Sequence, residues 1–71
     1  MFEITVWKLH SEKFAKSNAS DRQILLDHLH ASAARNGFVV TTRWDDGDDI
    51  AGALYRDGNE VAIWKIEEVE A

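Results

Sequence analysis

The chain reads Ile50-Ala51-Gly52-Ala53-Leu54-Tyr55-Arg56-Asp57-Gly58-Asn59-Glu60-Val61-Ala62-Ile63-Trp64-Lys65-Ile66, and this stretch predicts a β-hairpin. Its centre, Asp57-Gly58, is typical of a two-residue turn, which needs positive φ at its central positions. Strict alternation from this turn pairs Arg56 with Asn59 and Leu54 with Val61. One face of the hairpin should then carry Ile50, Leu54, Val61 and Ile63, and the other Ala51, Ala53, Tyr55, Ala62, Trp64 and Ile66.

A main helix is predicted over residues 20–36. Ser20 and Gln23 form a capping-box pattern at its start, and Asn36-Gly37 is a typical C-terminal stop. At about 100° per residue, one apolar stripe should face the sheet. The stripe consists of Leu25, Leu26, Leu29 and Ala33.

The remaining segments complete a two-layer α+β fold in the order β-α-β-β-β, with one main helix packed on a four-stranded mixed sheet. We expect one domain over residues 1–71. A strand should span 1–9, and the strand that follows the helix should run parallel to it, because a helical crossover joins them. The other predicted segments are a connector with a possible short helix at 10–19, a three-stranded antiparallel meander at 37–66 and an acidic tail at 67–71.

Size and composition restrict how this fold is stabilised and where it is found. With 71 residues and no cysteine, the chain has neither disulfides nor thiolate metal ligands to supplement a small core. A second subunit is the remaining supplement, so a homodimer is one expectation. The N-terminal residues lack a signal-peptide pattern and no segment has the length of a membrane span, so we expect a cytoplasmic protein without membrane contact.

One face of the predicted sheet is too apolar to be left in water. It would carry Trp7, Tyr55 and Trp64, with Arg43 beside them, while the helix covers the opposite face. Exposed apolar patches of this kind mark contact sites. The alternatives are that segment 10–19 folds over this face, that a second copy covers it, that another protein binds it, or that nucleobases stack on it.

Acidic residues concentrate at one end of the same sheet. Residues 45–71 contain nine carboxylates and two cations, and the whole chain carries a formal charge of -5. Because two of the predicted strands run in the same direction, the acidic loop and the acidic tail should lie at one end. This acidic pole comprises Asp45, Asp46, Asp48, Asp49, Glu67, Glu68 and Glu70. It suits solvent or a basic partner surface; it lacks the spacing of an EF-hand loop, so no metal ligand is assigned.

Catalytic patterns are weak. His28 and His30 lie two positions apart and point to different sides of the helix, so they do not form a chelating pair. No serine sits in a nucleophile-elbow pattern, and no glycine-rich phosphate loop is present. We assign no catalytic residue and no cofactor.

The sequence therefore predicts a noncatalytic protein–protein interaction module, comparable in class with small acidic inhibitors, antitoxins and phage or bacterial host-modulating proteins. Its candidate partner-binding residues are Trp7, Arg43, Tyr55, Trp64, Asp45, Asp46, Asp48 and Asp49. The first alternative is a nucleic-acid-associated regulator that uses the basic region around the helix (Lys13, Lys16, Arg22 and Arg35), although the net charge makes nucleic acid unlikely as a partner. The second is a small enzyme or divalent-cation binder.

Overall fold

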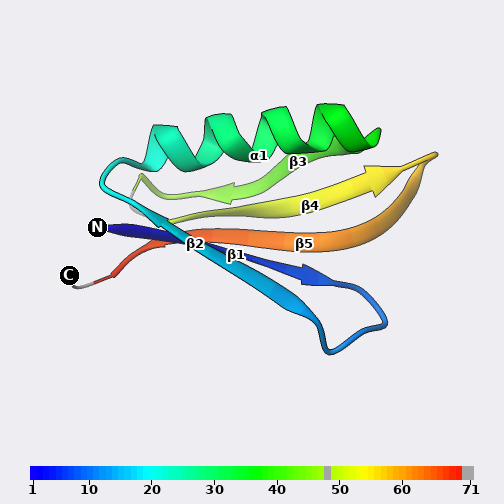
Figure 1. Ribbon diagram of the computed structural model, residues 1–71, viewed down its shortest axis with the longest axis horizontal. Helices are drawn as coiled ribbons and strands as arrows, with labels where there is room; N and C mark the ends of the chain where they lie inside the picture. The colour runs from blue at the N-terminus through cyan, green and yellow to red at the C-terminus, as the bar shows by residue number, and fades with distance from the viewer. Residues whose placement is uncertain (48, 70–71) are drawn as a thin grey trace.

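A five-stranded antiparallel sheet with one helix forms the fold in the computed structural model, which describes residues 1–47 and 49–69 (Figure 1). The elements are β1 (Phe2–Lys8), β2 (Phe14–Ala19), α1 (Arg22–Asn36), β3 (Val39–Asp45), β4 (Ile50–Arg56) and β5 (Asn59–Glu68). The strand order is β2-β1-β5-β4-β3. The prediction of a four-stranded mixed sheet was therefore wrong.

The strand that the sequence did not predict is β2, within the segment expected to be a connector or a short helix. Its sequence, Phe14-Ala15-Lys16-Ser17-Asn18-Ala19, contains no β-branched residue, and all but Ala19 are exposed. The strand exists because β1 supplies its hydrogen-bonding partner, with Phe2 opposite Ala19 and Trp7 opposite Phe14. An edge strand needs little apolar content of its own, so pattern reading passes over it.

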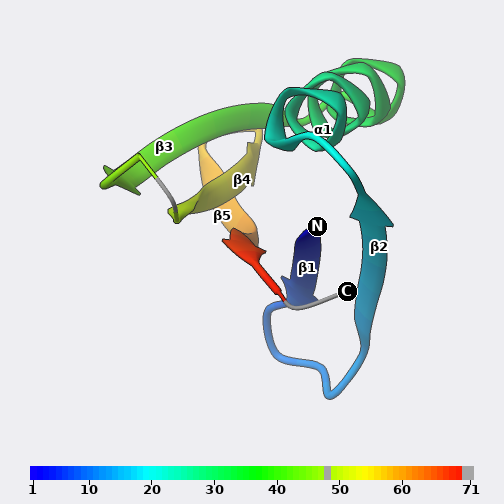
Figure 2. The same cartoon turned by 90° about the vertical axis from the view of Figure 1, so that its left-hand side faces the viewer.

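The parallel pairing expected for β1 was also wrong. β1 lies between β2 and β5 and is antiparallel to both. Helix α1 connects β2 to β3, which are the two edge strands, and therefore crosses the whole width of the sheet. Figure 2 shows the sheet curled, with α1 across the opening between its two edges. We call the helix-covered side the concave face and the opposite side the convex face.

Helix α1 begins and ends close to where the sequence predicted. The N-cap is Asp21 rather than Ser20, and its carboxylate accepts a hydrogen bond from the Gln23 backbone N–H at 2.8 Å. Gly37 ends the helix in the left-handed conformation, with φ of 74°. The buried residues of the helix, Leu25, Leu29 and Ala33, all belong to the predicted stripe.

The predicted turn of the second hairpin is present, but the register beyond it is different. Asp57 and Gly58 have φ of 53° and 80°, and Arg56 pairs with Asn59. A β-bulge follows, because Tyr55 pairs with Glu60 whereas Leu54 pairs with Ala62, leaving Val61 as an extra residue. One extra residue moves every later side chain to the opposite face.

This bulge decides the composition of the core. Trp64 and Ile66 are 1% and 0% exposed and lie with Ile4, Ile50 and Leu54 in the cluster beneath α1. The sequence placed both of them on the uncovered face, and that placement was wrong. Ile63, expected in the core, lies instead opposite Trp7 on the convex face.

A second β-bulge, on β3, moves a tryptophan toward solvent rather than into the core. Thr42 pairs with Gly52 and Trp44 pairs with Ala51, so Arg43 is the extra residue. Trp44 therefore lies on the convex face and is 50% exposed. Together the two irregularities place Trp44 on the convex face and Trp64 in the core.

Candidate interaction surfaces

The convex face carries exposed apolar side chains on β1 and β2 and again on β3, with β5 and β4 between them. We call these side chains the apolar band. Trp7 lies between Phe14 on β2 and Ile63 on β5 in the strand pairing. Trp7 is 37% exposed and Phe14 is 59% exposed, while Val39 and Trp44 on β3 are 62% and 50% exposed. Helix α1 packs on the other side of the sheet (Figure 2).

A polar cluster adjoins this band at Arg43, Tyr55 and Glu60. The Arg43 guanidinium donates to the Tyr55 hydroxyl at 2.8 Å and forms an ion pair with the Glu60 carboxylate. The Tyr55 hydroxyl also lies 3.4 Å from Glu60. The Arg43 charge is therefore already compensated, and the cluster fixes the Tyr55 ring at the border of the apolar band.

The predicted aromatic and arginine site residues separate into two groups. Trp7, Arg43 and Tyr55 lie on the convex face, as expected, whereas Trp64 lies in the core. The structure adds Phe14 and Trp44 to the exposed face. Phe14 could be assigned to this face only from its position opposite Trp7. That position is known only when residues 14–19 are paired with β1.

The acidic pole lies at the end of the sheet where β3 and β5 end and β4, which lies between them, begins. Asp45 pairs with Ile50, and Ile50 pairs with Ile66, which brings the acidic loop beside the end of β5. Arg22 at the start of α1 anchors the loop through Asp45 at 3.5 Å and the Gly47 carbonyl at 2.6 Å.

Within residues 1–47 and 49–69, no three histidine or carboxylate side chains are arranged to hold a metal ion. Asp48 and Glu70, which the sequence analysis assigned to the pole, lie outside the described residues.

Two of the basic residues proposed for nucleic-acid binding form ion pairs within the chain. Lys16 on β2 is paired with Glu3 at 3.5 Å, and Arg22 is engaged at the acidic loop. Arg35 lies in the last turn of the helix. In the described part of the chain, no helix is long and apolar enough to cross a membrane.

Comparison with known proteins assigns a family. The family model for Mycobacterium phage Gp84-like proteins matches residues 1–69. The chain belongs to this family. It is 39% identical over 66 residues to the Gene 84 protein of Mycobacterium phage D29, covering 93% of this chain and 95% of that protein. It is 38% identical over 69 residues to the Gene 84 protein of Mycobacterium phage L5, covering 97% and 100% respectively. No solved structure matches the chain.

Proposed function

We propose that this protein is a noncatalytic host-modulating protein that binds a protein of the mycobacterial host through the convex face. The family places the chain among small phage proteins, and the names of its relatives carry no activity or partner. The observation that carries the proposal is the exposure of three aromatic side chains of the convex face, Trp7, Phe14 and Trp44. Aromatic residues are enriched in protein interfaces because they bury a large area with few torsions to restrict.

Size and rigidity support this use of the face. The chain has 4848 Å² of accessible surface, so a standard contribution of about 800 Å² per partner would use roughly one sixth of it. Trp7, Phe14 and Trp44 stand on paired strands rather than on loops, so binding would order little backbone.

Charge narrows the kind of partner. Trp44 is followed directly by Asp45 and Asp46, so the acidic pole continues from the apolar band. A partner with an apolar centre and a basic rim on that side would match both features, and the net charge of -5 would speed its association.

The test uses the purified chain as bait in mycobacterial lysate, followed by titration of each purified captured protein against the chain. The triple variant Trp7→Ser/Phe14→Ser/Trp44→Ser should bind the partner at least about a hundredfold more weakly, because central aromatic residues dominate the binding free energy of interfaces. The matched control is Ile24→Ser, which removes a 42% exposed apolar residue from the helix. The control should bind as the native chain does.

The same variants separate a host partner from a second copy of the chain. Sedimentation should show a monomer at the concentrations used for binding. A dimer that dissociates in the triple variant and persists in Ile24→Ser would assign the convex face to self-association and refute the host-partner proposal. Equal retention of the purified partner by the triple variant would refute it as well.

A further inference from the structure

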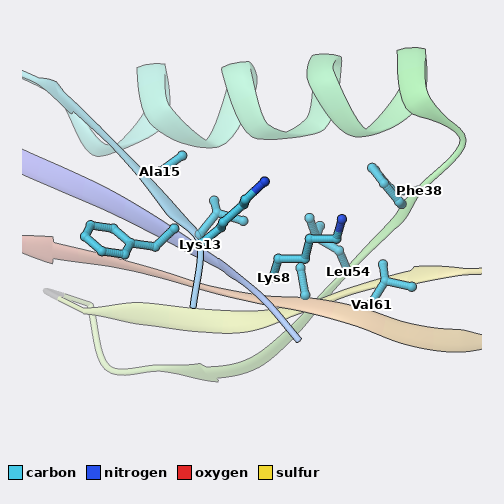
Figure 3. Close-up of a pocket in the computed structure, with 9 residues that line it drawn as sticks. Lys8, Lys13, Ala15, Phe38, Leu54 and Val61 are labelled. Atoms are coloured by element: carbon cyan, nitrogen blue, oxygen red, sulfur yellow. The ribbon is translucent and has the colours of Figure 1, made fainter. Parts of the chain in front are cut away.

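The concave face contains a cavity of about 400 Å³ that α1 does not fill. We propose that this cavity binds a single-chain aliphatic carboxylate, with the alkyl chain against the sheet and the carboxylate between Lys8 and Lys13. Figure 3 shows the two lysine side chains reaching from the β1–β2 hairpin beneath the helix, with Phe38 on the far side. Phe14 lines the cavity and also belongs to the convex face. The variants that test the site leave Trp7, Phe14 and Trp44 unchanged, so they test it independently of the proposed function.

The cavity exists because short side chains stand where the core would need long ones. Its lining is apolar apart from the two lysines and includes Ala15 on β2 and Ala62 on β5. The rest of the lining consists of Val6, Phe14, Phe38, Leu54 and Val61. The bulge at Val61 contributes directly, because the Val61 carbonyl accepts the backbone N–H of Leu9 at 3.0 Å and holds the end of the hairpin over this region.

Repulsion between the two lysine side chains destabilises the β1–β2 hairpin. Lys8 and Lys13 continue the pairing of Trp7 with Phe14, and the Lys8 backbone N–H donates to the Lys13 carbonyl at 3.2 Å. Like charges directly opposite each other on paired strands are destabilising. Among the described residues, no carboxylate lies within 4.0 Å of either ammonium group, whereas Lys16 and Lys65 each have one. An anion at the mouth of the cavity relieves this repulsion.

A third cation strengthens the preference for a negative ligand. The Arg56 guanidinium lies over the Phe38 ring at 4.4 Å and donates to the Asn36 carbonyl at 2.6 Å. The cavity lining contains no carboxylate, although the chain as a whole is acidic. The local charge is therefore opposite to that of the protein.

The volume and the apolar lining of the cavity indicate the size and the apolar character of the ligand. Small-molecule pockets typically enclose about 300–1,000 Å³ and are mostly apolar, with a few polar groups that orient the ligand. At about 30 Å³ for each water-sized group, 400 Å³ accommodates roughly a dozen heavy atoms. A saturated carboxylate of about ten carbons has this size, an apolar body and one charged end.

The experiment is calorimetric titration of the full chain with decanoate below its micellar concentration. We expect saturable binding with one ligand per chain and a rise in the thermal unfolding midpoint. Decyltrimethylammonium has the same chain and the opposite charge, and it should bind at least about tenfold more weakly because it meets two cations. Equal binding of the two ligands, or no binding of decanoate, would overturn the proposal.

Variants test the site itself. Lys8→Gln/Lys13→Gln should weaken decanoate binding by about tenfold or more, since charge-assisted hydrogen bonds are lost. Lys16→Gln/Lys65→Gln removes the same charge from the convex face and should leave binding unchanged. Ala15→Leu, on an exposed edge strand, should fill the cavity and abolish binding while the unfolding midpoint stays at or above the native value. Native affinity in the Lys8/Lys13 or Ala15 variant, or an equal loss in the Lys16/Lys65 variant, would refute the assignment.

Discussion

Gly52→Ala should be among the most destabilising single substitutions in this protein, although it adds only one methyl group. Gly52 lies in the middle of β4, with Thr42 opposite it on β3 and Trp64 opposite it on β5. A Cβ at this position would overlap the Thr41 carbonyl oxygen and lie 2.8 Å from its carbon. These are backbone atoms of the neighbouring strand, so no side-chain rotation relieves the clash.

The magnitude follows from the displacement of β3. Optimal carbon–carbon separations are about 3.5–4.0 Å, so the strand must retreat by about 1 Å. Loss of two or three backbone hydrogen bonds beside Gly52 would cost about 2–4 kcal/mol at about 1 kcal/mol each. A domain of this size is stable by only about 4–11 kcal/mol. The variant should therefore lose between about a fifth and all of the native stability, or release β3 altogether.

Urea unfolding, followed by circular dichroism and tryptophan fluorescence, measures this effect. With an m-value near 1 kcal/mol/M, the midpoint should fall by about 2–4 M. Gly58→Ala is the matched control, because nothing lies within 4 Å of its Cβ and only its positive φ of 80° opposes the substitution, at about 1–2 kcal/mol. A Gly52→Ala midpoint within about 0.5 M of the native value would refute the reasoning.

Two further predictions concern the helix start and the tryptophans. Asp21→Ala should lower the free energy of unfolding by about 1 kcal/mol because the first turn loses its N-cap acceptor, whereas Ser20→Ala should change it little; urea midpoints compare the two. In Trp7→Phe/Trp44→Phe, Trp64 is the remaining tryptophan and is 1% exposed, so its emission should be blue-shifted and resistant to acrylamide. Strong quenching of this variant while it remains folded would contradict the buried position of Trp64.

Local patterns in the sequence predicted the elements whose signals lie within a few residues. The helix stripe of Leu25, Leu29 and Ala33, the turn at Asp57-Gly58 and the exposure of Trp7 were all predicted. Each depends on helical periodicity, on turn chemistry or on alternation within one strand. The acidic loop beside the end of β5 also followed from strand direction alone.

Strand β2 was missed for a different reason. Its stability comes from β1 beside it rather than from its own residues, which are mostly exposed and include no β-branched side chain. Phe14 was therefore absent from the predicted interaction surface, and the sheet was one strand too small. No local signal in residues 14–19 distinguishes this edge strand from a connector.

The sequence by itself determined that an amphipathic helix packs on a sheet with an apolar second face, because periodicity is a property of each segment alone. Only the tertiary structure decided which tryptophan fills the core and which faces solvent. That choice depends on two single-residue irregularities, at Arg43 and Val61, which alternation does not reveal. The Val61 bulge is held by a hydrogen bond from Leu9, more than fifty residues away, so its cause lies in contacts between strands. The hairpin at residues 50–66 thus has its turn encoded locally and its register fixed by its neighbours.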